Sequence, residues 1–309
     1  MPAYLVTGGC GFIGSHLCDA LVARGDEVRV LDDLSTGRRS NLNPKADLVV
    51  GDVADGSAVA QAMRNVDGCF HLAAVASVER GNKEWVATHR TNLTGTITVF
   101  DAARMAGDRA ANPIPVVYAS SAAVYGDNPD LPLVETAEAR PLSAYGADKL
   151  GCEFHARVAG IVHKVPTLGL RFFNVYGPRQ DPSSPYSGVI SIFSARLRRR
   201  ASVTILGDGK QERDFVFVGD VVRALMSAMA NASTEARVFN VCSGVATSIL
   251  GLAETIASVC AAPLAIEFAA ARPGDIRRSL GSAARIEAAL GWRAERRLED
   301  GLRETASSL

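Results

Sequence analysis

The chain has 309 residues, 48% of them hydrophobic and 21% charged, which is typical of a globular protein with one large or two modest domains. Lysine and arginine together number 33, as do aspartate and glutamate, and this net charge of zero argues against a general nucleic-acid binder. The most apolar long window, residues 245–266, contains Glu254 and Pro263, so we expect no membrane span and no membrane partner.

The cysteines and histidines predict neither disulfides nor a metal site. Six cysteines are scattered without a C-x-x-C pair, and five histidines show no H-x-x-x-H spacing. The N-terminus runs directly into an apolar run, without the basic and apolar regions of a signal peptide. Together these features predict a cytoplasmic protein with reduced thiols.

The first half of the chain alternates short apolar runs with helical patterns. Strands are expected at residues 3–7, 27–32, 47–52, 68–74, 114–121 and 165–174. Helices are expected at residues 12–25, 57–65, 85–106 and 143–163. This alternation predicts an α/β fold with a doubly wound parallel (Rossmann) sheet, whose ligand lies at the carboxyl ends of the strands.

The composition changes after Asn174. Residues 175–188 are rich in Pro, Ser and Gly and are expected to form a loop, followed by a helix at 189–200, a strand at 202–206 and a turn at 207–214. We therefore expect a first domain at residues 1–174 and a smaller α/β region at residues 175–309. A strand at residues 237–244 is expected to return to the main sheet.

A glycine-rich turn follows the first expected strand. In the run TGGCGFIGSH, Gly8, Gly11 and Gly14 are spaced by three and stand between a strand and a helix, where glycines allow a backbone to approach a pyrophosphate. Asp32 ends the second strand and can accept both adenosine ribose hydroxyls. Because a carboxylate there would repel a 2′-phosphate, the pattern favours NAD over NADP.

A tyrosine and a lysine lie one helical turn apart in the expected helix 143–163. A free tyrosine has a pKa near 10 and is a poor base at neutral pH, but a neighbouring ammonium favours the phenolate and lowers that pKa. Tyr145 and Lys149 could therefore form a proton-transfer pair, while Ser121, at the end of the strand 114–121, could hold the substrate oxygen. Taken alone, the tyrosine–lysine spacing would equally suit an ordinary surface pair.

Together the motifs resemble those of a known enzyme family. The runs TGGCGFIG, SSAAVYG and Y-x-x-x-K are similar to those of the extended short-chain dehydrogenases/reductases, which use this glycine spacing. The runs RFFNVYGPRQ, GDGKQERDFVFVGDV and RPGDIRRS resemble the nucleotide-sugar branch of that family, above all the UDP-hexose 4-epimerases. The resemblance implies an enzyme that holds NAD tightly and epimerises a UDP-sugar through a transient 4-keto intermediate.

The resemblance also implies the residues of the site. The catalytic residues would be Ser121, Tyr145 and Lys149. The cofactor site would comprise Gly8, Gly11, Phe12, Ile13, Gly14, Asp32, Asp33, Ser35, Thr36, Gly37, Asp52, Val53, Leu72, Ala73, Ala74, Asn92, Tyr145, Lys149 and Phe173. The substrate site would comprise Ser77, Ser121, Tyr145, Asn174, Val189, Thr204, Arg213, Arg272, Asp275 and Ser279.

Other reactions of the family remain open. Nucleotide-sugar 4,6-dehydratases and decarboxylases place carboxylates after the catalytic hydroxyl residue, where this chain has Ala122 and Ala123. A 4-keto-sugar reductase would prefer NADPH, against which Asp32 argues. A non-catalytic dinucleotide sensor would resemble the glycine turn but lack the Tyr145 and Lys149 pair.

The identity of the sugar is open as well. Ser279 matches a position that gates the hexose pocket in the family, and its small size makes room for an N-acetyl group. Both UDP-Glc/UDP-Gal and UDP-GlcNAc/UDP-GalNAc are therefore expected substrates. UDP-glucuronate stays an alternative, because Arg80 or Arg196 could meet its carboxylate. Relatives are commonly homodimers through two helices, which here would be residues 85–106 and 143–163.

Overall fold

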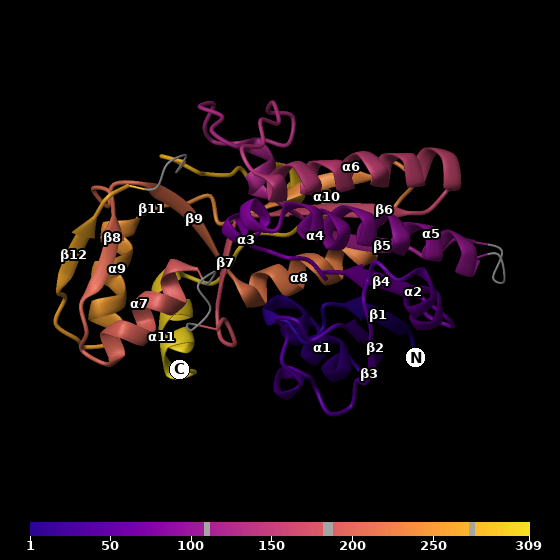
Figure 1. Cartoon of the computed structure of the whole chain (residues 1–309), viewed down its shortest axis with the longest axis horizontal. Coiled ribbons are helices and arrows are strands. Elements are labelled where there is room, and N and C mark those ends of the chain that lie inside the picture. Colours follow the sequence, from indigo (N-terminus) through magenta and orange to yellow (C-terminus); the bar gives the residue numbers. More distant parts are fainter. Residues whose placement is uncertain (108–111, 182–187, 272–275) are drawn as a thin grey trace. The chain divides into compact units, whose positions relative to one another are not determined.

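The computed structural model describes residues 1–107, 112–181, 188–271 and 276–309. The chain divides into two compact units (Figure 1). The first unit comprises residues 1–124, 143–171 and 222–239, and the second comprises residues 125–142, 172–221 and 240–309. The segment 125–142 therefore belongs to the second unit although it lies within the expected first domain, and the segment 222–239 belongs to the first unit.

A seven-stranded sheet with the order β10-β6-β5-β4-β1-β2-β3 dominates the structure. Its strands are β1 (Ala3–Thr7), β2 (Glu27–Asp32), β3 (Asp47–Val50), β4 (Gly68–His71), β5 (Val116–Ser121), β6 (Thr167–Phe172) and β10 (Arg237–Val241). Strands β1 to β5 pair in parallel. This order confirms the expected doubly wound fold, and its switch point lies between β1 and β4.

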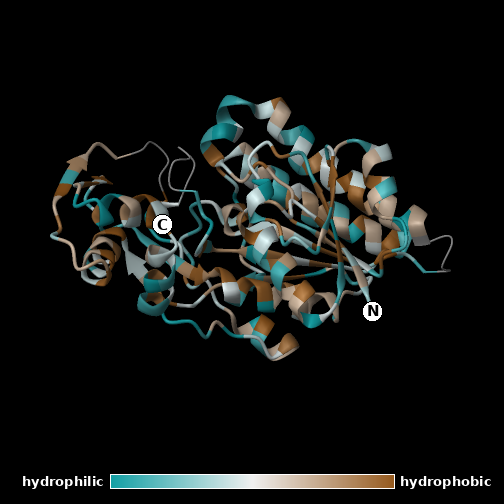
Figure 2. Cartoon of the chain, turned by 90° about the horizontal axis from the view of Figure 1, so that it is seen from below, coloured by the Kyte–Doolittle hydropathy of each residue, from teal (hydrophilic) through white to brown (hydrophobic). Residues whose placement is uncertain are grey.

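Helices connect the strands of this sheet. They are α1 (Phe12–Arg24), α2 (Gly56–Ala62), α3 (Val78–Lys83), α4 (Trp85–His89), α5 (Gly95–Gly107), α6 (Ala144–His163) and α8 (Val218–Met229). Figure 1 shows α5 and α6 side by side, and the two helices are in contact. Brown and teal residues alternate around the helices in Figure 2, as expected for helices with one face on a core.

Helix α6 has clear start and stop signals. The Ser143 hydroxyl accepts a hydrogen bond from the Gly146 amide at 3.1 Å and so caps the first turn. The helix ends at Lys164, which adopts a left-handed conformation with φ of 56°. These caps fix the 20 residues that carry Tyr145 and Lys149.

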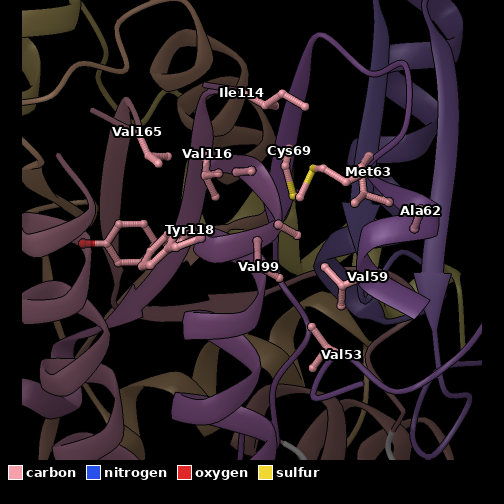
Figure 3. Close-up of a cluster of buried hydrophobic side chains, with 14 of the residues drawn as sticks. Val53, Val59, Ala62, Met63, Cys69, Val99, Ile114, Val116, Tyr118 and Val165 are labelled. Atoms are coloured by element: carbon pink, nitrogen blue, oxygen red, sulfur yellow. The ribbon is translucent and has the colours of Figure 1, made fainter. Parts of the chain in front are cut away.

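The core of the first unit lies between the sheet and its helices (Figure 3). Val59, Met63, Cys69 and Val99 are fully buried there, and the Met63 and Cys69 side chains point toward one another in Figure 3. Burial of each such side chain contributes roughly 1.5–3 kcal/mol. This packing holds β4, α2 and α5 as one body, so the carboxyl ends of the strands form a firm platform.

The expected helix 85–106 is interrupted by a π-helical turn. Helix α4 ends at His89, the turn η2 (Arg90–Thr94) has π-helical hydrogen bonding, and α5 begins at Gly95. Sequence periodicity does not reveal such a turn, because one extra residue per turn barely disturbs an apolar pattern. Turns of this kind occur often at functional sites.

The second unit contains two small sheets. Strands β7 (Asn174–Tyr176), β9 (Glu212–Phe217) and β11 (Ala246–Ser248) form one, and β8 (Val203–Leu206) pairs with β12 (Ile266–Ala269) in the other. The helices of this unit are α7 (Val189–Arg198), α9 (Ile249–Val259), α10 (Ala284–Leu290) and α11 (Leu298–Ser307). The expected turn 207–214 was too long, because β9 begins at Glu212, and the expected loop 175–188 contains the end of β7.

A buried carboxylate organises the second unit. Asp214 is fully buried and accepts hydrogen bonds from the Ser243 amide and hydroxyl, both at 2.7 Å, and from the Gly244 amide at 2.9 Å. The Gly281 amide lies 3.3 Å from its Oδ2 atom. Burial raises the pKa of this carboxyl above its usual value, although all these donors oppose the shift. Asp214 thus joins β9 to two segments that are distant in sequence.

None of the helices in the described parts of the chain combines the length and the apolar character that crossing a membrane requires.

Candidate active site

The glycine-rich turn connects β1 to α1. Gly8 has φ of 72°, and a Cβ atom there would lie 2.7 Å from the Ala73 amide nitrogen, so only glycine fits. Gly11 stands at the N-cap of α1 without a side-chain cap, and a Cβ on Gly14 would collide with the carbonyl oxygen of Gly8. Phe12 and Ile13 begin the helix. The first turn therefore offers its amide N–H groups and the positive end of the helix dipole to an anion.

Asp32 ends β2 and faces this turn. Its carboxylate accepts hydrogen bonds from the Cys10 amide at 2.9 Å and from the Leu34 amide at 2.8 Å. Burial raises the pKa of the Asp32 carboxyl. A Cβ on Gly37 would lie 2.9 Å from Asp32 Oδ1, so glycine keeps the carboxylate face open. Two lone pairs remain available for ribose hydroxyls.

The neighbouring loop is exposed and is ordered by Asp33. The Ser35 amide donates to Asp33 Oδ1 at 2.9 Å and its hydroxyl donates to the same atom at 2.7 Å. Thr36 is exposed beside them. This Asx turn presents the loop 33–37 close to Asp32.

Asp52 and Val53 follow β3 and have different environments. Asp52 Oδ2 forms an ion pair with Arg90 Nη1 at 2.6 Å. The Val53 side chain is 5% exposed and packs in the core against Gly95. Only the backbone of Val53 is therefore suited to a ligand contact.

The loop after β4 is held by two buried side chains, Thr7 and His71. The Thr7 hydroxyl accepts from the amides of Leu72 and Ala73 at 3.2 Å and lies 2.8 Å from His71 Nδ1. His71 Nε2 lies 3.0 Å from Thr96 Oγ1, which donates its own proton to the Asn92 carbonyl at 2.6 Å.

Counting donors fixes the tautomer of His71. Since the Thr96 proton is used, Nε2 must donate to Thr96 and Nδ1 must accept from Thr7. Burial, with a smaller contribution from the charge of Lys149, lowers the pKa of His71 to about 3. The imidazole is therefore neutral, and it fixes the segment that begins at Leu72.

Asn92 fixes the far end of the same segment. It lies on the turn η2, fully buried, where Oδ1 accepts from the Val75 amide at 2.8 Å and Nδ2 donates to the Val75 carbonyl at 3.2 Å. The side chain thus pairs with the backbone as a neighbouring strand would. Leu72, Ala73 and Ala74 are consequently held between Thr7 and Asn92 and lie beside Gly8.

The expected catalytic residues lie around the carboxyl end of β5. Lys149 is 3% exposed, and its ammonium donates to the Ala119 carbonyl at 2.9 Å. The same nitrogen lies 5.9 Å from the ring centroid of Tyr145. Ser121 ends β5 two residues after Ala119, and its hydroxyl oxygen accepts from the Ala123 amide at 3.1 Å. The Ser121 proton remains available for another acceptor.

Ser77 caps the short helix α3 beside this region. Its hydroxyl accepts from the Arg80 amide at 3.0 Å, and Arg80 forms an ion pair with Glu84 at 2.9 Å. Gly81 on the same helix packs near the Tyr145 backbone, since a Cβ on Gly81 would lie 3.7 Å from the Tyr145 amide nitrogen. Helix α3 therefore borders the N-terminal end of α6, which carries Tyr145.

Taken together, these residues of the first unit fit a dinucleotide. The space that a Cβ on Gly8 or Gly14 would fill and the N-terminus of α1, which has no side-chain cap, suit a pyrophosphate. The Asp32 carboxylate suits a ribose. Phe173, the remaining expected cofactor residue, lies in the second unit, 5% exposed and packed against Tyr125 at 6.4 Å between centroids.

The second unit gathers three of the expected substrate residues along β9. Arg213 lies on this strand, Asn174 of β7 pairs with Phe215, and the Ser279 amide donates to the Glu212 carbonyl at 3.0 Å. Val189 begins α7, and Thr204 lies on β8, which pairs with β12 and not with β9. Arg272 and Asp275 lie outside the described residues.

Sequence reasoning missed Thr7 and His71. Thr7 ends β1 and His71 ends β4, and these are neighbouring strands of the sheet. Their position at the strand ends was the sequence feature that could have identified them. A histidine inside the apolar run GCFHLAA marks a buried polar group that needs partners. Neither partner could be named from sequence, since Thr96 lies on a distant helix.

Known proteins resemble this chain over most of its length. The model of the "NAD dependent epimerase/dehydratase family" matches residues 4–242. A UDP-glucose 4-epimerase of Mycolicibacterium smegmatis is 39% identical over 97% of this chain and 96% of its own length.

Two solved structures extend the likeness to the fold. A UDP-glucose 4-epimerase of Thermus thermophilus in complex with NAD is 34% identical, with a TM-score of 0.90 over 99% of this chain and 98% of that one. A UDP-N-acetylglucosamine 4-epimerase of Methanobrevibacter ruminantium, in complex with UDP-N-acetylmuramic acid, is 33% identical, with a TM-score of 0.93 over 99% and 97% of the two chains. These matches confirm the expected fold, an enzyme and NAD as cofactor: the chain belongs to the NAD-dependent epimerase/dehydratase family.

Proposed function

We propose that this protein is a UDP-hexose 4-epimerase that uses bound NAD and accepts UDP-GlcNAc/UDP-GalNAc as well as UDP-Glc/UDP-Gal. The observation that carries the proposal is the arrangement around the end of β5. Lys149 is anchored to the Ala119 carbonyl beside the Tyr145 ring, and Ser121 follows two residues later. This group stands on the same unit as the glycine turn and Asp32.

In the proposed reaction the residues move and hold protons at the C4 oxygen of the sugar. Tyr145 removes the C4 hydroxyl proton, the Lys149 ammonium favours its phenolate, and Ser121 donates to the C4 oxygen. Bound NAD supplies the acceptor and return source of the C4 hydride. After the transient 4-keto sugar turns its other face, Tyr145 returns the proton, and the C4 configuration is inverted without net oxidation.

The proposal disfavours elimination of water and decarboxylation. The dehydratases and decarboxylases that this chain resembles place a carboxylate after the catalytic hydroxyl residue, and here the short helix η3 (Ala122–Tyr125) begins with two alanines. A methyl group cannot transfer a proton. A dinucleotide sensor without catalysis is disfavoured by the buried, anchored Lys149.

We further propose that the first unit binds NAD and that the second unit binds the nucleotide-sugar. Arg213 carries a guanidinium suited to a diphosphate, and Ser279 is a small, 9% exposed side chain on the segment bound to β9. Asn174, Val189 and Thr204 would be further substrate residues of the second unit, together with Arg272 and Asp275. Ser77 would be a substrate residue of the first unit. UDP-glucuronate stays an alternative: Arg80 pairs with Glu84, and Arg196 on α7 is the other arginine that could meet its carboxylate.

The test is a side-by-side assay of UDP-Glc, UDP-GlcNAc and UDP-glucuronate with the purified enzyme, without added cofactor. We expect C4 epimers from the first two and retention of NAD through purification. A Ser279→Tyr variant should keep turnover of UDP-Glc and lose that of UDP-GlcNAc at least tenfold. Equal loss on both sugars would contradict the role of Ser279, and no C4 epimer from any substrate would overturn the proposed function.

We also infer a homodimer in which α5 and α6 of one copy pack against those of another. Phe154, Val158 and Val162 on α6 are 62%, 47% and 62% exposed, which is unusual for apolar side chains on one helix face. Met105 on the adjacent α5 is 52% exposed.

All six cysteines are free thiols, which supports a reducing cytoplasmic setting.

A further inference from the structure

A buried ion pair lies beneath the proposed catalytic residues. Arg171 of β6 binds Glu153 of α6 through two parallel bonds, Nε to Oε1 at 2.8 Å and Nη2 to Oε2 at 2.7 Å. The Ser120 hydroxyl of β5 donates to the same Oε1 at 2.5 Å. The three residues are 6%, 9% and 1% exposed. One carboxylate therefore joins a helix to two neighbouring strands.

Stability alone is a poor reason for this arrangement. Removing two charges from water costs as much as their attraction returns, so apolar residues of similar volume often serve a core equally well. The ion pair lies at the edge of the hydrophobic core, to which Tyr118, next but one to Ser120 on β5, belongs. Unlike apolar packing, the ion pair fixes the orientation of its two side chains, because the guanidinium fork and the carboxylate fit in only one way.

A fixed orientation of Glu153 also fixes Lys149, because Glu153 lies one helical turn after it on α6. Residues four apart lie on one face of a helix, and here both reach β5. Lys149 binds the Ala119 carbonyl and Glu153 binds the Ser120 hydroxyl. Two successive turns of α6 are thus fastened to two successive residues of β5. The residue after Ser120 is Ser121, and the residue one turn before Lys149 is Tyr145.

We propose that Glu153 and Arg171 are positioning residues, which fix the rotation and the axial position of α6 against β5 and so set Tyr145 and Lys149 relative to Ser121. This inference rests on the proposed function, since it assigns no chemistry of its own to the ion pair. A shift of α6 by a fraction of a turn would separate the ammonium from the phenol and both from the substrate oxygen. Misplacement of about 1 Å can cost 100-fold in rate.

The main test replaces both charges at once, in Glu153→Met/Arg171→Met, which leaves no uncompensated buried charge. We expect a folded enzyme that retains NAD and whose KM changes less than threefold, while kcat falls at least tenfold. The pH profile of kcat should change as well, because the Lys149 ammonium would no longer lie beside the Tyr145 ring. A purely structural role would leave that profile unchanged.

Two further variants keep the test decisive should the double variant fold poorly. Ser120→Ala removes only the anchor on β5 and should lower kcat threefold or more with the same change in the pH profile. Arg171→Lys keeps the charge but not the fork, and should recover less than half of the wild-type kcat. Arg29→Met serves as the control: it removes an arginine that is likewise tied to carbonyls, those of Ala62 and Arg64, but distant from β5.

Wild-type kcat and an unchanged pH profile in Ser120→Ala and in the folded double variant would overturn the positioning role. The proposed function fails separately, if Tyr145→Phe keeps its turnover. A Tyr145→Phe enzyme without activity, beside a fully active double variant, would refute the inference about Glu153 and Arg171 and leave the proposed function standing.

Discussion

The ammonium nitrogen of Lys149 lies 5.9 Å from the ring centroid of Tyr145. A cation at this distance from an aromatic ring is held partly by the ring itself, and in the proposed reaction it would stabilise negative charge on the phenol oxygen. The hydrogen bond to the Ala119 carbonyl prevents the ammonium from swinging away. The two residues are thus kept together by the strand as well as by the helix.

Tyr145→Phe should abolish most turnover while leaving the fold and the bound NAD intact. The variant loses only the proton-transferring hydroxyl, whose contribution we expect to be about 100-fold to 10,000-fold in kcat. Steady-state kinetics and the NAD content of the purified protein test this. Tyr4→Phe, which removes a hydroxyl from β1, is the control and should stay active. Turnover within threefold of wild type in Tyr145→Phe would contradict the proposed role.

Gly8→Ala should release NAD and destabilise the first unit. Gly25→Ala is a matched control, because Gly25 also has a positive φ, 94°, but a Cβ there meets nothing within 4 Å. The control should lose about 1–2 kcal/mol from backbone strain and keep NAD. Gly8→Ala adds a contact of 2.7 Å with the Ala73 amide nitrogen and should lose more. Thermal unfolding measures the loss of stability, and the ratio of absorbance at 260 and 280 nm measures the bound NAD. If Gly8→Ala and Gly25→Ala lost equal stability and kept equal NAD, the glycine turn would not be the NAD site.

The neutral His71 makes stability depend on pH. In the unfolded chain an imidazole binds a proton below about pH 6.5, whereas folded His71, with its pKa lowered by burial, stays neutral down to about pH 3. Protonation therefore favours the unfolded chain, and the free energy of unfolding should fall by up to about 1.4 kcal/mol per pH unit below pH 6.5.

A His71→Gln variant isolates this contribution. Gln cannot titrate, so its free energy of unfolding should fall less steeply between pH 6.5 and 5 than that of the wild type. Urea unfolding at several pH values gives both slopes. His163→Gln, at an exposed position on α6, is the control for replacing a histidine by glutamine outside the core. Parallel slopes for His71→Gln and wild type would show that His71 binds a proton as readily in the folded protein as in the unfolded chain.

Phe154→Glu should convert the inferred dimer to a monomer. A carboxylate on the apolar face of α6 would have to be buried between two copies without a partner. Phe268→Glu on β12 is a suitable control, because Phe268 is 60% exposed and Phe154 is 62% exposed. Sedimentation velocity at several concentrations distinguishes the species. A monomeric wild type, or a dimeric Phe154→Glu, would remove α6 from the interface.

The fold could be predicted from the periodicity of apolar residues, whereas the candidate site could be predicted only in part. The strand ending in Thr7, the glycine turn and Asp32 are local patterns, so their positions could be predicted directly. Lys149 could be assigned a role but not its anchor, because the Ala119 carbonyl carries no sequence signal. His71 and Arg171 were missed for the same reason: each acts through partners that are brought together by packing.

The buried carboxylate of Asp214 sets an order of events in the folding of the second unit. Its donors lie 29, 30 and 67 residues further along the chain. At about 5–20 residues per second, a ribosome needs roughly 3–13 seconds to extend the chain from Asp214 to Gly281. Because a buried carboxylate needs its donors, the second unit can close around Asp214 only after Ser243 and Gly244 have been made, and the last donor, the Gly281 amide, follows later still. The first unit, whose last segment is 222–239, has all of its residues before Ser243 is added.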